Sequence, residues 1–451
     1  MSTFFKRKAY DRIAEWKKVS NGRTALLIEG ARRIGKSTVA ERFAQENYAD
    51  YLLIDFSLDG IDVRENFGNI GNLDTFFRNL FLLRGKSLPK GDAVIIFDEV
   101  QLYPPARQAI KVLVKDGRYH YIETGSLISI RKNVKDILIP SEEERTKMYP
   151  MDFEEFLWAT NDEVTVPAIR EAFESRKALP DAIHRRIMRD FRTYMAVGGM
   201  PQAVELLVHG DDFAGIDRIK RTILDLYEED LGKHDEDEGD RVAEVFKSIP
   251  SQLSHHNARF QFATIDKAAR ARSLSRSVSF LRESMMVNIC CNVTAPEVAL
   301  GLYENRDDFK AYMGDTGLLV TQMMRGDPQT GDELYKALVT DRLGINEGMV
   351  VENAVAQALA ANGHGLYFHR FSYRSAGSKK ENAYEVDFLI VRGKRLCPIE
   401  VKSSGYKSHK SFDYFTEKYD VKVNERLIVY TKNLARKGNL TYLPLYMAMC
   451  L

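Results

Sequence analysis

The amino-acid sequence predicts an α/β protein that begins with a parallel-sheet domain and ends with a smaller α/β domain, with a largely helical part between them. Three observations lead to this prediction. A glycine-rich loop follows the first apolar run, several apolar runs alternate with helical segments in the N-terminal third, and two strand patterns near the C-terminus carry Asp and then Glu-x-Lys.

The glycine-rich loop at residues 30–37 has the composition of a phosphate-binding site. It lies directly between the apolar run 25–28 and a helical stretch from Thr38 to Glu46. Glycines let backbone N–H groups surround an anion, and the positive end of the following helix points to the same place. The loop therefore predicts ATP and Mg²⁺ as ligands, with Lys36 at the outer phosphates and Ser37 on the metal. We expect the nucleotide to contact Gly30, Ala31, Arg32, Arg33, Ile34, Gly35, Lys36, Ser37 and Thr38.

Apolar runs at residues 25–29, 51–56, 93–97 and 119–123, with helical segments between them, predict a parallel sheet with crossover helices. The third run ends in Asp98-Glu99, at the edge where α/β sheets bind ligands. We expect Asp98 to hold the Mg²⁺ shell and Glu99 to polarise water as the catalytic base. A solvated strand end is the alternative for this pair.

The fourth run ends in residues 123–126, which read Glu-Thr-Gly-Ser. This order of runs resembles the branch of P-loop ATPases that has an additional central strand and a catalytic glutamate. In that branch a polar residue at the end of the next strand senses the γ-phosphate, and the resemblance implies this catalytic role for Thr124 or Ser126. A turn satisfied by its hydroxyls is the alternative. An arginine from a neighbouring subunit commonly completes such sites, and Arg131 and Arg145 are candidates.

The middle of the chain is predicted as a helical lid on the nucleotide, from residue 151 to 234. A Gly-Gly-Met-Pro turn at 198–201 ends one helix and starts another. The acidic cluster at 235–240 is interpreted as a solvated hinge.

Residues 235–325 are predicted as a winged-helix domain, because a helix pattern at 274–283 precedes strand patterns at 286–293 and 309–312. Two roles stay open for its basic residues. They either contact DNA phosphates, or the module joins domains or subunits and its arginines form salt bridges to other parts. These residues are Arg259, Lys267, Arg270, Arg272, Arg276 and Arg282.

The C-terminal part, residues 326–451, combines a helical segment that carries Glu352 with a predicted hairpin of two strands. Side chains alternate faces along a strand, so Glu400 and Lys402 share one face, and the hairpin can bring Asp387 beside them. Two carboxylates and a lysine can form a divalent-metal site that activates water at a phosphodiester. We expect catalytic roles for Asp387, Glu400 and Lys402, and metal ligation by Asp387, Glu400 and Glu352.

The spacing Asp-x₁₂-Glu-x-Lys, with an upstream helical glutamate, resembles the PD-(D/E)xK superfamily of restriction-endonuclease-like folds. Val386 stands where the name of the motif has proline, a frequent departure in that superfamily. The short motif also occurs on ordinary amphipathic hairpins.

Over nearly its whole length the chain resembles a family of bacterial and archaeal AAA-type ATPases. The resemblance is carried by FKRK through Trp16, GARRIGKST, IIFDEV, ETGS, MYPMDFEEFL, GGMP, KAYMGDTGLL, VEN, EVDFLI and IEVKSS. It implies a P-loop NTPase parallel-sheet domain at 1–150, a helical lid at 151–234, a winged-helix domain at 235–325 and an α/β nuclease-like domain at 326–451. The phrase at 314–317, Gly-Asp-Thr-Gly, is interpreted as a turn with a capping aspartate.

Two functions from different classes follow. One is an ATP-dependent enzyme whose nucleotide state licenses DNA binding or metal-dependent DNA cleavage. The other is a regulatory ATPase whose nucleotide state switches assembly, as a homo-oligomer through the ATPase domain, while the C-terminal domain binds a partner without cleavage. A third possibility is an ATP-binding protein with negligible turnover.

Composition excludes some classes of protein. The 451 residues carry 65 Lys and Arg against 64 Asp and Glu, a net charge of +1, so any nucleic-acid surface is local. Four cysteines without a CxxC spacing suit a reducing compartment and disfavour structural zinc. No apolar stretch reaches the ~18 residues that span a bilayer, and the start has no signal-peptide pattern. We expect a cytoplasmic protein with no membrane partner.

Overall fold

The computed structural model describes residues 4–126, 141–232, 239–254, 260–261, 271–325, 331–340, 347–374, 380–404, 409–419, 423 and 425–451. The chain divides into two compact units. The first unit is Met1–Tyr149 with Glu283–Met285, and the second is Pro150–Arg282 with Met286–Leu451. Several predicted features lie outside the described residues, namely Arg131, Arg259, Lys267, Arg270 and residues 235–238 of the acidic cluster.

The first unit contains a five-stranded sheet in the order β2-β3-β4-β1-β5, and all its strands are parallel. The predicted parallel sheet is therefore confirmed. Its elements are α1 (Lys8–Ser20), β1 (Ala25–Glu29), α2 (Lys36–Asn47), β2 (Asp50–Asp55), α3 (Ile61–Asn66), η1 (Phe67–Asn69), α4 (Leu73–Arg84), β3 (Ala93–Asp98), η2 (Val100–Leu102), α5 (Pro104–Asp116), β4 (His120–Gly125) and β5 (Glu143–Lys147).

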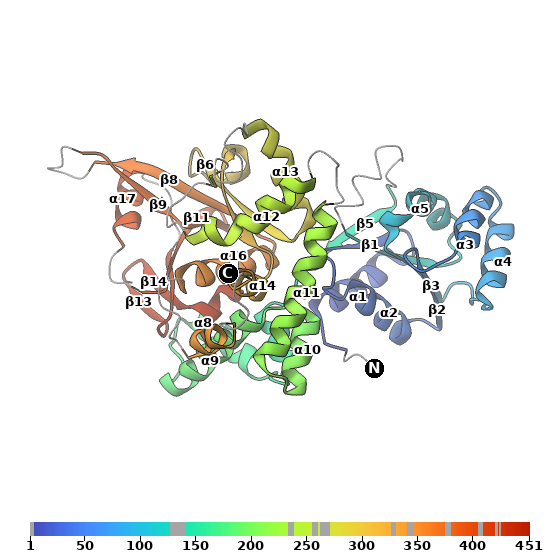
Figure 1. The fold of residues 1–451 in the computed structure, drawn as a ribbon, viewed down its shortest axis with the longest axis horizontal. Coiled ribbons are helices and arrows are strands. Elements are labelled where there is room, and N and C mark those ends of the chain that lie inside the picture. The colour runs from blue at the N-terminus through green and yellow to red at the C-terminus, as the bar shows by residue number, and fades with distance from the viewer. Residues whose placement is uncertain are drawn as a thin grey trace. The chain divides into compact units, whose positions relative to one another are not determined.

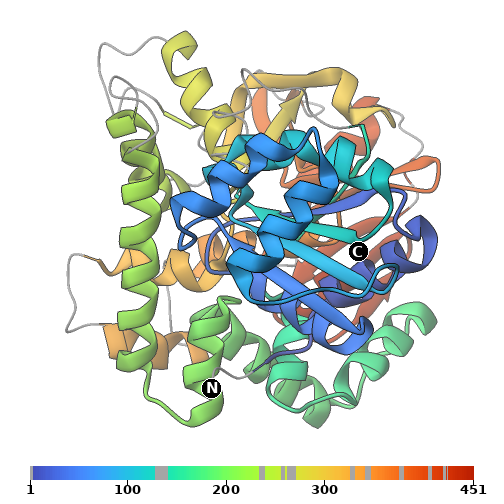
Figure 2. The same ribbon diagram turned by 90° about the vertical axis from the view of Figure 1, so that its right-hand side faces the viewer.

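Strands β1 and β3 are buried along their whole length because helices cover both faces of the sheet. Helices α1 and α2 lie on one face and α5 on the other (Figure 1). Figure 2 shows the blue helices α3 and α4 in front of the strands, where their apolar residues join those of α5 in one core. This arrangement leaves the carboxyl ends of the strands free to carry polar side chains.

The edge strand β5 was not predicted from the sequence. It reads Glu-Glu-Arg-Thr-Lys and lacks the apolar pattern of the other strands. Charged residues are common on edge strands, which pair on one side only, and β5 pairs with β1 in parallel.

The second unit is built from helices and two sheets. Its helices are α7 (Phe153–Ala159), α8 (Thr165–Ser175), α9 (Asp181–Val197), α10 (Pro201–His209), α11 (Phe213–Gly232), α12 (Gly239–Ser254), α13 (Ala271–Ser284), α14 (Thr316–Met323), α15 (Gly331–Val339), α16 (Glu347–Ala361) and α17 (Lys410–Tyr419), with short 3₁₀ turns at Leu300–Tyr303 and Leu445–Cys450. Its strands are β6 (Val287–Val293), β7 (Glu304–Met313), β8 (Tyr367–Tyr373), β9 (Asn382–Val386), β10 (Phe388–Arg392), β11 (Arg395–Lys402), β12 (Arg426–Tyr430), β13 (Ala435–Lys437) and β14 (Leu440–Pro444).

One sheet of this unit has the order β10-β11-β12-β14-β13 and contains the predicted hairpin. Strands β10 and β11 are antiparallel, and β11 runs parallel to β12, to which helix α17 connects it. The first predicted strand of the hairpin is divided in two, because β9 ends at Val386 and β10 begins at Phe388. Asp387 lies at this division.

The other sheet, β7-β6-β8-β9, crosses the predicted boundary between a winged helix and a C-terminal domain at residue 325. Strands β6 and β7 form the expected antiparallel pair, but β6 also pairs in parallel with β8, with Cys291 opposite Tyr367. A separate winged-helix domain is therefore not confirmed. Local patterns predicted the strands and missed a pairing between residues far apart in sequence.

The helices predicted as a lid pack within the second unit. The side-chain amide of Gln357 on α16 donates to Tyr194 on α9 at 3.0 Å, and Arg176 pairs with Glu425 at 2.7 Å. These contacts join residues 151–234 to the C-terminal part of the chain. Their role as a lid on the nucleotide stays a prediction.

Helices long and apolar enough to cross a membrane are not found in the described ranges.

Candidate functional sites

The phosphate loop joins β1 to α2, and its glycines serve two different purposes. Gly35 precedes the helix with a φ of +90°, a left-handed conformation that glycine adopts without strain. Gly30 lies against neighbouring atoms, since a Cβ there would be 2.4 Å from the Met148 carbonyl oxygen. Larger residues at either position would displace the loop backbone, which is the part expected to surround phosphate.

Lys36 is buried within the first unit and lies along its own loop. Its Nζ donates hydrogen bonds to the carbonyl oxygens of Gly30 at 3.1 Å and Ala31 at 2.8 Å. Burial lowers the pKa of Lys36 to about 8, against the opposing effect of Glu99 and Asp98. Phosphate oxygens are stronger acceptors than these carbonyl oxygens. When a nucleotide binds, the Lys36 ammonium can therefore leave the two carbonyl oxygens and donate to the phosphates.

Asp98, at the end of β3, connects the loop to the neighbouring strand. Ser37 Oγ donates to Asp98 Oδ1 at 2.6 Å, and the hydroxyl of Thr124 on β4 donates to the same oxygen. Burial raises the pKa of Asp98, and the two hydrogen bonds lower it. Hydroxyl and carboxylate oxygens are the ligands that Mg²⁺ prefers, so Ser37 and Asp98 fit the predicted metal. Of the two residues considered as a γ-phosphate sensor, Thr124 contacts Asp98.

Glu99 has a φ of +52°, which is uncommon for a residue with a side chain. Such a conformation costs of order 1–3 kcal/mol and is often found at functional sites. The backbone N–H of Glu99 lies 3.4 Å from Thr124 Oγ1, and the side-chain amide of Gln101 donates to Glu99 Oε2. Gln101 was not predicted as part of the site, although it follows Glu99 closely in sequence.

Arg7 supports the phosphate loop from outside it. Its guanidinium donates to the Ile34 carbonyl oxygen at 2.6 Å and to the Tyr149 carbonyl oxygen at 2.7 Å, and the side chain is buried. Arg7 belongs to the segment FKRK, whose sequence alone indicates no role for it. The contact shows that this segment helps to hold the loop in place.

Arg145, one of the two candidates for an arginine finger, makes ion pairs within the first unit. It lies 2.8 Å from Glu143 and 3.6 Å from Glu29. Glu143 also accepts two hydrogen bonds of 2.8 Å from Arg107, and both of these side chains are almost fully buried. The role of a finger in a neighbouring subunit stays a prediction.

In the second unit, six ionisable side chains gather between the two sheets and helix α16, and we name them the charged centre. They are Lys310 on β7, Glu352 on α16, Glu385 on β9, Asp387, and Glu400 and Lys402 on β11. Four of them were predicted as site residues. Lys310 and Glu385 were not.

The predicted hairpin residues come together. Asp387 Oδ2 accepts a hydrogen bond of 2.8 Å from the backbone N–H of Val401, which lies between Glu400 and Lys402 on β11. Lys402 Nζ lies 2.5 Å from Glu400 Oε1. Burial, followed by the nearby charge of Glu352, raises the pKa of Asp387 to about 8.

Glu352 is bonded differently from the prediction. Its Oε1 lies 3.0 Å from Lys310 Nζ and accepts a hydrogen bond from the hydroxyl of Tyr312. In the part of the chain that the structure describes, no three or more His, Cys, Asp or Glu side chains are arranged to hold a metal ion. The predicted ligand set of Glu352, Asp387 and Glu400 is therefore not assembled there, and a metal role for these residues stays a prediction.

The predicted basic surface is described at one side chain, that of Arg282. Its guanidinium lies 3.0 Å from Glu304 and donates to Cys291 Sγ at 2.8 Å. Arg282 thus forms an ion pair within the protein, which is the alternative to a phosphate contact.

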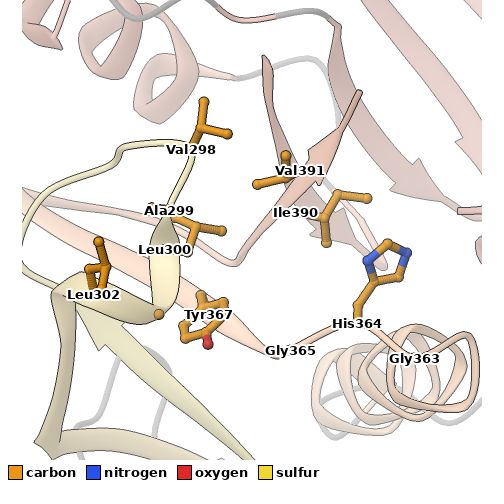
Figure 3. Close-up of a pocket in the computed structure, with 11 residues that line it drawn as sticks. Val298, Ala299, Leu300, Leu302, Gly363, His364, Gly365, Tyr367, Ile390 and Val391 are labelled. Carbon is orange, nitrogen blue, oxygen red and sulfur yellow. The ribbon is translucent and has the colours of Figure 1, made fainter. Parts of the chain in front are cut away.

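A pocket of about 460 Å³ opens elsewhere in the second unit (Figure 3). Figure 3 shows Leu300, Tyr367 and Ile390 around the hollow, from three separate segments. The lining is mostly apolar and includes no residue of the charged centre. It comprises Val298, Ala299, Leu300, Gly301, Leu302, Gly363, His364, Gly365, Tyr367, Ile390 and Val391.

Three protein families match parts of the chain. An AAA domain matches residues 22–157, which hold the phosphate loop, Asp98, Glu99 and Thr124. A domain of unknown function, DUF8612, matches residues 188–329, and a second one, DUF4143, matches residues 347–447. A comparison with curated protein sequences gives no match.

Several solved structures align with the chain at low similarity. The RuvB Holliday junction branch migration motor of Thermotoga maritima has 14% identity and a TM-score of 0.27, over 63% of this chain and 89% of its own. A signal transduction ATPase with numerous domains from Pyrococcus horikoshii has 12% identity and a TM-score of 0.27, over 80% and 49%. An Hsp104–ADP complex from S. cerevisiae has 13% identity and a TM-score of 0.29, over 80% and 46%. Scores this low support no inference about function.

Proposed function

We propose that the AAA domain at residues 22–157 binds ATP with Mg²⁺ and hydrolyses it. The observation that carries this proposal is the shared oxygen of Asp98, which accepts hydrogen bonds from Ser37 of the phosphate loop and from Thr124 of β4. The Asp98 carboxylate thus connects the phosphate loop, the end of β3 and the end of β4, the strand that lies between β3 and β1 in the sheet. This is the place where α/β sheets bind ligands.

Each residue has a stated role in the proposed reaction. Lys36 binds the outer phosphates, and the loop backbone from Gly30 to Thr38 surrounds them. Ser37 and Asp98 would hold Mg²⁺, which would neutralise phosphate charge when bound. Glu99, held by Gln101, orients and deprotonates the attacking water, while Thr124 keeps Asp98 in place and lies beside the γ-phosphate.

The proposal is tested with the full chain by measuring binding of a fluorescent ATP analogue and release of phosphate. Lys36→Ala is expected to weaken nucleotide binding by more than about tenfold. Glu99→Gln is expected to retain binding while the hydrolysis rate falls by about 10²-fold or more. The matched control is Glu65→Gln, the same change at an exposed position of the first unit. Equal rates for Glu99→Gln and the wild type would remove Glu99 from the mechanism.

We further propose that the nucleotide state controls homo-oligomeric assembly through the ATPase domain or partner binding through the second unit. The support is the division of the chain into two compact units, one of which holds the nucleotide site. Size-exclusion chromatography with light scattering, with and without ATP, compares the wild type with Lys36→Ala. A change of mass or shape in the wild type alone is expected. No change with ATP would remove this proposal.

A second candidate function is cleavage of DNA by the charged centre. It is favoured by the gathering of Asp387, Glu400 and Lys402 on one hairpin, as a PD-(D/E)xK site requires. Plasmid DNA incubated with the full chain, ATP and Mg²⁺ or Mn²⁺ is expected to be nicked. Cleavage that persists in both Asp387→Ala and Lys402→Ala would exclude this centre as the source.

A further inference from the structure

Lys310 has a location that the sequence did not reveal. It lies on β7 with a nearly buried side chain, and its Nζ is 3.0 Å from Glu352 Oε1 and 2.6 Å from Glu385 Oε1. Tyr312 is two residues further along the strand, so its side chain is on the same face and reaches the same oxygen of Glu352. One strand thus supplies two donors to one carboxylate on α16.

The charges around Lys310 keep it protonated. Burial disfavours the ammonium, but Glu352, Glu385 and Asp387 together raise the pKa of Lys310 well above its ordinary value. Arg370 lies on the other side of Glu385, with its guanidinium 3.1 Å from Glu385 Oε2. The carboxylates of Glu352 and Glu385 therefore face protein cations in this structure.

The Lys310 ammonium lies between the carboxylates of Glu352 and Glu385, where a metal ion bound by them would lie, and it already supplies a positive charge there. A divalent cation ligated by Glu352 would either displace Lys310 Nζ, which lies 3.0 Å from Glu352 Oε1, or lie beside the positive charge of Lys310 and be repelled by it. Both alternatives are costly in a buried site.

We infer that the Lys310 ammonium takes the place of a metal cation in the charged centre. Glu352 is then a residue that positions Lys310, through its contacts with Lys310 and Tyr312 of β7, and it is not a metal ligand. The inference concerns side chains of the second unit and is independent of the proposed ATP hydrolysis. It bears on DNA cleavage by the charged centre, the second candidate function, because it removes Glu352 from the three predicted metal ligands of that site.

The charged centre consequently draws on two of the matched regions. Lys310 and Tyr312 belong to residues 188–329, whereas Glu352, Glu385 and Asp387 belong to residues 347–447. Without β7, these three carboxyl groups would face one another with Lys310 missing from among them. The two regions therefore share one electrostatic unit, which the β6–β8 pairing holds together.

The test measures binding of Mn²⁺ alone to the full chain by titration calorimetry and by electron paramagnetic resonance. All proteins carry Asp98→Asn, which removes the carboxylate expected to hold Mg²⁺ in the first unit. Glu352→Gln keeps the shape of the side chain and is expected to leave Mn²⁺ affinity and stoichiometry unchanged. Loss of one bound Mn²⁺ ion from the stoichiometry in Glu352→Gln would overturn the inference, because Glu352 would then be a ligand.

Lys310→Met is expected to create a Mn²⁺ site at least about tenfold tighter than any in the background protein, and the double variant Lys310→Met/Glu352→Gln is expected to lose it. Tyr312→Phe is the matched control, since it removes the other donor to Glu352 and leaves the ammonium. It is expected to gain no site. A folded Lys310→Met protein, verified by circular dichroism, that gains no Mn²⁺ site would contradict the inference. If Lys310→Met does not fold, Glu352→Gln decides.

Discussion

Asp315 accepts a hydrogen bond of 2.6 Å from the backbone N–H of Gly199 on its Oδ2 and one of 2.9 Å from the N–H of Leu318 on its Oδ1. The second bond caps helix α14, as expected of the Gly-Asp-Thr-Gly phrase. The first bond was not expected. It joins this phrase to the Gly-Gly-Met-Pro turn after α9, more than a hundred residues earlier in the chain.

The glycines of the two phrases permit this approach. Gly198 has a φ of +86°, and a Cβ there would be 2.2 Å from Asp315 Oδ1. A Cβ on Gly317 would be 2.4 Å from the Val197 carbonyl oxygen. Lys220 completes the junction, since its buried Nζ donates to the carbonyl oxygens of Ala196 and Gly317. These two segments thus form a structural junction of the second unit.

Asp315→Ala is expected to lower the free energy of unfolding by about 2–4 kcal/mol, because two buried N–H groups lose their acceptor. Urea denaturation followed by circular dichroism measures the change. The control is Asp212→Ala, which removes an exposed cap that accepts from Gly215 and is expected to cost about 1 kcal/mol. Equal losses in the two variants would show that the Gly199 contact contributes nothing.

Gly317→Ala is expected to destabilise the second unit by at least about 2 kcal/mol, because the added methyl group would meet backbone atoms that cannot move away easily. Gly232→Ala is the matched control, since a Cβ at this helical position meets nothing within 4 Å. That variant is expected to be neutral or slightly stabilised. Thermal unfolding of both proteins beside the wild type decides, and a Gly317→Ala protein as stable as the wild type would be inconsistent with so close an approach.

ATP affinity is expected to fall as the pH rises through about 8, the pKa of Lys36. Lys36 is charged below this pH and neutral above it, and the phosphates bind the charged form. If only that form binds, affinity at pH 9 is about tenfold weaker than at pH 7. Titration of a fluorescent ATP analogue across this range measures the effect, with Lys36→Ala as the control that should show no such step. A flat wild-type profile would mean that Lys36 is not the group concerned.

Arg7→Met is expected to weaken ATP binding by about tenfold without unfolding the first unit, because the Ile34 carbonyl oxygen in the loop loses a buried donor. Arg23→Met is the control, since Arg23 donates to the carbonyl oxygens of Val19 and Ser20, outside the loop. Nucleotide titration and circular dichroism are measured on both. Equal affinity in the two variants would show that Arg7 does not position the loop.

Arg107→Met and Glu123→Gln are expected to lower the free energy of unfolding by very different amounts at pH 7. Loss of Arg107 removes two hydrogen bonds from the buried carboxylate of Glu143, which keeps its contact with Arg145, and is expected to cost about 2 kcal/mol or more. Burial and the neighbouring Glu143 raise the pKa of Glu123 well above its ordinary value, which favours the neutral form, so Glu123→Gln is expected to cost less than about 1 kcal/mol. Chemical denaturation measures both. A large loss in Glu123→Gln would show that Glu123 is ionised.

The sequence by itself determined the features that depend on neighbouring residues. Glycine spacing specified the phosphate loop, continuous apolar runs specified the buried strands, and the Asp98-Glu99 pair at a strand end specified where the polar side chains of the site lie. The hairpin of β10 and β11 also follows from local alternation, and with it the proximity of Asp387, Glu400 and Lys402. These features are encoded within a few residues of one another, where backbone sterics and side-chain periodicity act.

Only the tertiary structure decided the rest. Strand β5 forms because it can pair with the edge of the sheet at β1. Strands β6 and β8 pair although many residues separate them in sequence. Lys310 meets Glu352, and Asp315 meets Gly199, because separate elements pack together and each buried polar group must find a partner there. No local pattern encodes such a meeting, since a buried lysine and an exposed one look alike in sequence. Packing therefore places Glu352, which the sequence predicts as a metal ligand, in contact with Lys310.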